Sequence, residues 1–124
     1  MDKVIHFEIP FDDKKRATGF YERLFGWGLM DVPKMDYVII HAAKTDKENM
    51  VVEAGAINGG LFPRETKGSG PIIVIGVASI DDKIMEIEAA GGKQTLPKVA
   101  IPGGHYARFV DTEGNLIGLV DSLK

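Results

Sequence analysis

The stretch HFEIPFDDKKRATGFYERLFGW, residues 6–27, decides how the fold begins. Its first part belongs to a predicted strand, Val4–Pro10, whose side chains alternate between two faces, so that His6 and Glu8 share one face. The opposite face carries Ile5, Phe7 and Ile9. Apolar side chains then recur at helical spacing, at Ala17, Phe20, Tyr21, Leu24 and Phe25. Asp12 or Asp13 offers an N-cap oxygen, and Gly26 ends the pattern. The stretch therefore predicts a strand followed by an amphipathic helix.

The same order of elements occurs twice along the chain. After the first helix, strands are predicted in Asp36–Ala42, Met50–Glu53 and Ala56–Phe62. Residues 63–71, PRETKGSGP, lack periodicity and are rich in turn-forming residues, which is typical of a linker. The apolar run Ile72–Val77 then predicts a buried strand, and a capping pattern from Ser79 predicts a second helix. Short strands are predicted after it, near Lys93–Leu96, His105–Val110 and Leu116–Asp121.

This repetition predicts one domain, 1–124, built from two copies of one unit. Each copy is a βαβββ module, the first covering about 1–62 and the second about 72–124, with the linker between them. Each module has a helix with one apolar side and a sheet for that side to cover. We therefore predict an α+β fold in which the two modules form a curved mixed sheet around a cleft, with the helices outside.

The composition excludes several classes of protein. The chain has 124 residues and a net charge of −3, with no basic run, so nucleic-acid binding is not expected. Cysteine is absent, which excludes disulfides, thiolate nucleophiles and Cys-ligated metal centres. No apolar stretch approaches the roughly 20 residues of a membrane-spanning helix. The opening residues MDKVIHFEIP lack the apolar segment of a signal peptide, so we expect no membrane association and a cytoplasmic location.

The beginning and the end of the chain resemble the vicinal oxygen chelate superfamily, which includes glyoxalase I, the bleomycin-resistance proteins and the extradiol dioxygenases. The opening resembles it in the spacing of His6, Asp13, the pair Phe20-Tyr21 and the sequence Leu24-Phe25-Gly26. Residues 109–119, FVDTEGNLIGL, are similar to the Phe-x-Asp-Pro-x-Gly-Asn ending of the superfamily, with Thr112 in place of the proline. The resemblance implies two βαβββ modules, frequent assembly as a homodimer, and a site in the concave cleft.

The resemblance also implies where a metal would be bound. Metal-dependent members have four ligands, two from each module, and the corresponding positions here are His6, Gly60, Ile72 and Gly118. Because His6 alone carries a donor, we expect no cofactor and no metal site. A divalent ion at a rearranged His6/Glu8/His105 site remains open as an alternative, and His41 is a further candidate donor. The glyoxalase I reaction needs a metal and a glutamate, so glycine at 60 and 118 argues against it.

These positions predict instead an apolar cleft that binds a small molecule. The predicted ligand-binding residues are His6, Glu8, Gly60, Ile72, Val74, His105, Tyr106, Leu116 and Gly118. Glycine removes charge and opens volume at two of them, which suits a small, largely apolar or aromatic ligand. We therefore predict a glyoxalase/bleomycin-resistance-like protein that binds such a ligand without a metal. Tyr37 and Trp27 are expected to serve in packing or in dimer contacts.

Two other readings of the sequence remain open. His6 and Glu8 can form an acid–base dyad, because a carboxylate would raise the imidazole pKa by its charge, and both are then the candidate catalytic residues. The protein would in that case be a glyoxalase-like lyase or isomerase, so the sequence leaves open whether it is an enzyme. The third reading is an accessory domain that acts through its dimer surface.

Overall fold

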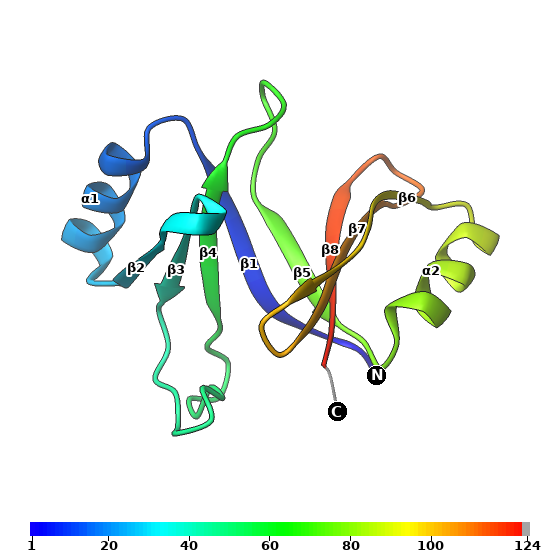
Figure 1. The fold of residues 1–124 in the computed structure, drawn as a ribbon, viewed down its shortest axis with the longest axis horizontal. Helices are drawn as coiled ribbons and strands as arrows, with labels where there is room; N and C mark the ends of the chain where they lie inside the picture. Colours follow the sequence, from blue (N-terminus) through cyan, green and yellow to red (C-terminus); the bar gives the residue numbers. More distant parts are fainter. Residues whose placement is uncertain (123–124) are drawn as a thin grey trace. The chain divides into compact units, whose positions relative to one another are not determined.

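The computed structural model describes residues 1–122 and divides the chain into two compact units (Figure 1). The first unit is His6–Pro71, and the second combines Met1–Ile5 with the chain from Ile72 onward. Strand β1 (Lys3–Phe11) begins in the second unit and continues into the first. Each unit contains one strand-helix-strand-strand-strand succession, so the predicted α+β fold of two βαβββ modules is confirmed.

The first unit is a four-stranded sheet with one helix. After β1 come α1 (Lys14–Phe25), β2 (Gly28–Val32), a 3-10 turn η1 (Pro33–Met35), β3 (Tyr37–His41) and β4 (Asn58–Pro63). The strand order is β2-β3-β4-β1, with β1 and β4 parallel and the other pairs antiparallel. Asp13 caps α1 by accepting a hydrogen bond from the Arg16 N–H at 2.9 Å, and Gly26 ends it with a φ of 68°. The predicted start and end of this helix are therefore confirmed.

One predicted strand of the first unit is wrong, and another strand was missed. Met50–Glu53 forms no strand: Val51 makes only an isolated bridge with Thr45, and Asp46 Oδ1 accepts hydrogen bonds from the N–H groups of Glu48 and Met50 in a turn between them. The missed strand is β2, which directly follows the helix and pairs with β3. β2 is mostly exposed and lies at the edge of the sheet, so its sequence shows no apolar alternation.

The second unit repeats the arrangement. It contains β5 (Ile72–Gly76), α2 (Ile80–Ala89), β6 (Lys93–Ile101), β7 (Gly104–Val110) and β8 (Leu116–Ser122). The strand order is β5-β8-β7-β6, with β5 and β8 parallel and the other pairs antiparallel. Ser79 Oγ accepts the Asp82 N–H at 3.2 Å, which confirms the predicted capping pattern.

Each unit has its own apolar core between its sheet and its helix. In the first unit the buried residues are Phe11, Val38, Ile40 and Leu61, with Phe7, Ile9, Ala17, Tyr21, Trp27 and Leu29 packed against them. In the second they are Val77, Ile80, Ile84, Ala107, Phe109 and Leu119. Because side chains alternate along a strand, His6 and Glu8 project from the sheet face that α1 does not cover, as predicted.

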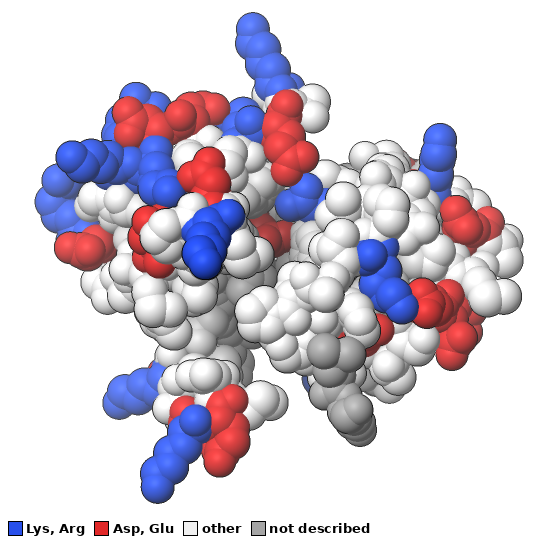
Figure 2. All heavy atoms as spheres, viewed as in Figure 1, with Lys and Arg blue, Asp and Glu red and all other residues white. Residues whose placement is uncertain are grey.

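Two surface properties bear on the class of protein. Figure 2 shows acidic and basic side chains lying among one another on the face that it draws. Neither helix of residues 1–122 has the length and the apolar composition of a membrane-spanning segment.

Candidate functional site

The first unit joins His6, Tyr37 and Glu8 in a chain of hydrogen bonds. The Tyr37 hydroxyl donates to Glu8 Oε2 at 3.0 Å, and the Tyr37 hydroxyl oxygen lies 3.0 Å from His6 Nε2. A hydroxyl group carries one proton, and that of Tyr37 is directed at Glu8. The Tyr37 oxygen must therefore accept the hydrogen on His6 Nε2. This bond selects the Nε2–H form of a neutral His6 and leaves the Nδ1 lone pair as its proton acceptor. Glu8 is 5% exposed, so the chain ends on a buried carboxyl group.

The register of the sheet places these groups around Gly60. Gly60 of β4 lies opposite Glu8 of β1 and Ile39 of β3, and Tyr37 stands two residues before Ile39 on the same face. A Cβ atom at Gly60 would overlap the Tyr37 hydroxyl. The expectation that glycine opens volume at this position is therefore wrong, because the phenol ring of Tyr37 fills that volume.

The charge state of His6 is set mainly by its surroundings in the sheet. Burial lowers the pKa of His6 below its ordinary value of 6.5, and the negative charge of Glu8 opposes this only in part. Glu8 raises the pKa of His6 by its charge, as expected from the sequence, but desolvation outweighs this charge, so the overall shift is downward. His6 is a neutral imidazole at neutral pH, which can donate a hydrogen bond at one nitrogen and accept a proton at the other.

The second unit contains a similar tyrosine and glycine. Gly118 of β8 lies between Val74 of β5 and Arg108 of β7, and Tyr106 stands two residues before Arg108. A Cβ atom at Gly118 would lie 3.0 Å from the Tyr106 hydroxyl and 3.0 Å from Val74 Cγ2. Arg108 Nε donates to this hydroxyl at 2.8 Å, and its guanidinium lies 5.4 Å from the ring centroid.

Tyr37 with Gly60 and Tyr106 with Gly118 thus occupy equivalent places in the repeat. In both units the tyrosine is two residues before the cross-strand neighbour of the glycine. Tyr37 was not predicted as a site residue. The Gly-Leu pair occurs in both modules, as Gly60-Leu61 and Gly118-Leu119. If the two modules are aligned on this pair, Tyr37 in the strand before Gly60 corresponds to Tyr106 in the strand before Gly118.

The other predicted ligand-binding residues lie in the second unit. Ile72 is 4% exposed and Val74 is completely buried, whereas Leu116 at the start of β8 is half-buried. His105 was predicted to begin a strand, and it is the second residue of β7, which starts at Gly104. It projects from the face that α2 covers, opposite to the face of Tyr106, and lies 2.8 Å from Asp121. It therefore does not share a surface with Tyr106 and Gly118.

The residues at the four positions implied by the resemblance do not fit a metal centre. His6 Nε2 is engaged with Tyr37, Gly60 and Gly118 have no side chains and are covered by tyrosines, and Ile72 is apolar. Within residues 1–122, no group of three or more His, Asp or Glu side chains is arranged to hold a metal ion. His41 is exposed at the end of β3 and belongs to no such group.

Comparisons with known proteins agree with this architecture. Residues 3–42 match the family described as Bleomycin resistance protein-like N-terminal. Among solved structures, a hypothetical protein from Bacillus halodurans C-125 is 20% identical, with a TM-score of 0.66 over 99% of this chain and 96% of that chain. A Streptomyces coelicolor methylmalonyl-CoA epimerase in complex with 2-nitronate-propionyl-CoA is 16% identical, with a TM-score of 0.66 over 98% of each chain. No curated protein matches the chain in sequence.

A third solved structure extends the comparison. A methylmalonyl-CoA epimerase from Mycobacterium tuberculosis is 15% identical, with a TM-score of 0.63 over 97% of this chain and 87% of that chain. The chain therefore has the vicinal oxygen chelate fold, and its opening residues are bleomycin-resistance-protein-like. The resemblance predicted from the sequence is thus confirmed.

Proposed function

We propose that this protein binds a small, largely apolar or aromatic molecule without a metal, and that the His6–Tyr37–Glu8 chain recognises the polar group of this ligand. The hydrogen-bonded chain is the observation that carries the proposal. It stands on the helix-free face of the first unit, and it combines a neutral imidazole, a phenol and a buried carboxyl group. Such groups fix the orientation of a ligand whose binding energy comes mainly from apolar contact.

The absence of ligating side chains at the implied metal positions supports the same proposal. Glycine at 60 and 118 allows each tyrosine ring to lie across its strand, so that phenol hydroxyls stand where the resemblance implies metal ligands. Burial of about 200 Å² of apolar ligand surface gives roughly 5 kcal/mol before the cost of association. We therefore expect micromolar or weaker affinity unless polar contacts add to it.

Ile72, Val74, Tyr106, Leu116 and Gly118 remain proposed ligand contacts of the second unit. The homodimer that the resemblance implies is likewise a proposal for this chain. Multi-angle light scattering on the purified protein tests it, since a mass of one chain would contradict it.

A second candidate function is proton transfer in a lyase or isomerase. The observation that favours it is the neutral His6, whose Nδ1 lone pair can take a proton while Nε2–H stays bonded to Tyr37. Methylmalonyl-CoA epimerases share the fold, so methylmalonyl-CoA is a practical first substrate. Incorporation of deuterium from heavy water at its α-carbon, lost in His6→Gln, would support this candidate over simple binding.

Calorimetric titration tests the binding proposal. The probes are bleomycin and a set of small phenols and aromatic acids, each titrated into the metal-free protein. We expect at least one probe to bind, and Tyr37→Phe to weaken it about ten-fold, the worth of one hydrogen bond to a charged or strongly polar group. Tyr21→Phe is the matched control, because Tyr21 packs on the helix side of the sheet. Equal affinity of wild type and Tyr37→Phe for every bound probe would contradict the proposal.

A further inference from the structure

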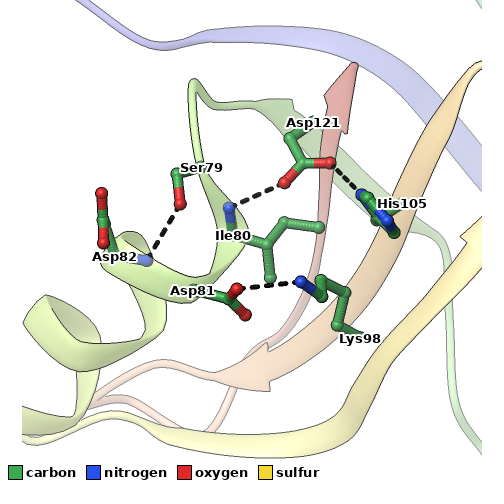
Figure 3. Close-up of polar contacts among 7 residues, drawn as sticks. All are labelled: Ser79, Ile80, Asp81, Asp82, Lys98, His105 and Asp121. Carbon is green, nitrogen blue, oxygen red and sulfur yellow. Dashed lines mark hydrogen bonds and ion pairs between the residues drawn. The ribbon is translucent and has the colours of Figure 1, made fainter. Parts of the chain in front are cut away.

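A second group of polar side chains lies in the second unit, on the sheet face that α2 covers (Figure 3). Asp121 of β8 is 9% exposed, and its two oxygens have different partners. Oδ2 accepts the backbone N–H of Ile80 at 2.9 Å, and Oδ1 lies 2.8 Å from Nδ1 of His105. Asp121 therefore connects the first residue of α2 to β7.

The environment keeps Asp121 ionised. Burial by itself would raise the pKa of Asp121, but hydrogen bonds from the Ile80 N–H and from His105, together with the positive charges of His105 and Lys98, bring that pKa below its ordinary value. Lys98 of β6 lies nearby and is also paired with Asp81 of α2 at 2.8 Å. An ionised carboxylate only accepts hydrogen bonds, so the Nδ1 of His105 carries the hydrogen that it shares with Asp121.

The other ring nitrogen of His105 reaches solvent. The side chain keeps 26% of its accessible surface. Every buried side-chain nitrogen or oxygen among residues 1–122 has a hydrogen-bond partner, and the contact of His105 with these residues is made through Nδ1. Nε2 is therefore accessible, and in neutral His105 it carries the lone pair.

From this geometry we infer that His105 and Asp121 form a general-base site of their own, separate from the His6–Tyr37–Glu8 chain. A buried carboxylate that holds Nδ1–H orients the imidazole and stabilises the imidazolium formed when Nε2 takes a proton. The matching substrate class is an activated carboxylic ester attacked by water. The water proton moves to Nε2 as its oxygen bonds to the acyl carbon, the alkoxide or phenolate leaves, and Nε2 returns the proton to solvent.

Hydrolysis of 4-nitrophenyl acetate by the full chain tests the inference. Above the buffer rate, we expect His105→Ala to lower hydrolysis about 100-fold or more, since a positioned general base contributes about 10²- to 10⁴-fold, and Asp121→Asn to lower it in part. His41→Ala is the control, because His41 is an exposed histidine of the first unit and should keep the wild-type rate. A wild-type rate in His105→Ala would overturn the inference.

A second measurement includes a wild-type comparison that does not depend on how well the variants fold. Carbethoxylation of the wild-type protein by diethyl pyrocarbonate, followed by peptide mass spectrometry, reports the reactivity of each histidine. We expect modification of His105 at a rate at least equal to that of His41, and several-fold slower modification of His105 in Asp121→Asn with His41 unchanged. Protection of His105 in the wild type while His41 reacts would show that Nε2 is closed to solvent, and the inference would fail.

Discussion

The hydroxyl group of Tyr37 lies over Gly60, in the space that any side chain at position 60 would need. Tyr106 and Gly118 stand in the same relation in the second unit, with 3.0 Å between the Tyr106 hydroxyl and a Cβ placed on Gly118. The two glycines therefore admit tyrosine rings, and the polar atoms at these places are phenol oxygens. This relation accounts for glycine at positions where the resemblance implies metal ligands.

Gly60→Ala should disrupt this arrangement. The added methyl group overlaps the Tyr37 hydroxyl, so the ring must move and its bonds to His6 and Glu8 must lengthen. We expect a loss of about 1–3 kcal/mol in the free energy of unfolding, measured by denaturant titration. Gly19→Ala is the control: Gly19 lies within α1 with no atom near its Cβ position, so alanine should stabilise by about 0.5–1 kcal/mol. Equal effects of the two substitutions would refute the steric argument.

Tyr37→Phe should cost stability even without a ligand. Removal of the hydroxyl leaves the His6 Nε2–H and a Glu8 oxygen without this partner in a partly buried place. The expected loss is about 1–3 kcal/mol by thermal or chemical unfolding. Tyr21→Phe, on the other side of the sheet, should change stability by less than about 0.5 kcal/mol. A Tyr37→Phe protein as stable as wild type would mean that the hydrogen-bonded chain is absent in solution.

The free energy of unfolding should decrease as pH falls and His6 becomes protonated. Because burial lowers the pKa of His6 in the folded state, the unfolded chain binds this proton first as pH decreases. The stabilising contribution is complete above about pH 6.5, the ordinary histidine pKa, and decreases as pH falls from there to the lowered folded pKa. Urea titrations across this range should show the slope, and His6→Gln should reduce it. An unchanged slope in His6→Gln would assign the effect to another group.

Asp121→Asn should weaken the attachment of α2. The variant loses the charge that accepts the Ile80 N–H and binds His105, and we expect a loss of about 1–3 kcal/mol. In the wild type, the contribution of Asp121 is present above the ordinary carboxyl pKa and is lost as pH falls through its lowered folded pKa. Asp81→Asn removes an exposed ion pair with Lys98 and should cost less than about 1 kcal/mol. A larger loss in Asp81→Asn than in Asp121→Asn would contradict this ranking.

Periodicity and capping residues predicted most of the fold. Asp13, Gly26 and Ser79 mark their helix ends by local hydrogen bonds or by backbone conformation, which depend on neighbouring residues alone. The edge strand β2 was not predicted, because an exposed edge needs no apolar alternation. Met50–Glu53 was predicted as a strand, but Val51 makes only an isolated bridge with Thr45, beside a turn in which Asp46 Oδ1 accepts two backbone N–H groups.

The site was predicted only in part, because its geometry depends on register between distant strands. Strand alternation placed His6 and Glu8 on one face, as the structure has them. Tyr37 joins them only through the pairing of β3 with β4 and of β4 with β1. His105 and Tyr106 were both predicted to bind the ligand, but they are neighbours on β7 and therefore project to opposite faces of the sheet.

Native mass spectrometry of the protein, purified without a chelator, measures whether it holds a metal. We expect chains that carry no divalent ion, with or without a bound organic molecule, and the mass of that molecule would help to identify the ligand. One divalent ion retained per chain, and lost in His6→Gln, would show that a metal centre forms at this site and would contradict the account.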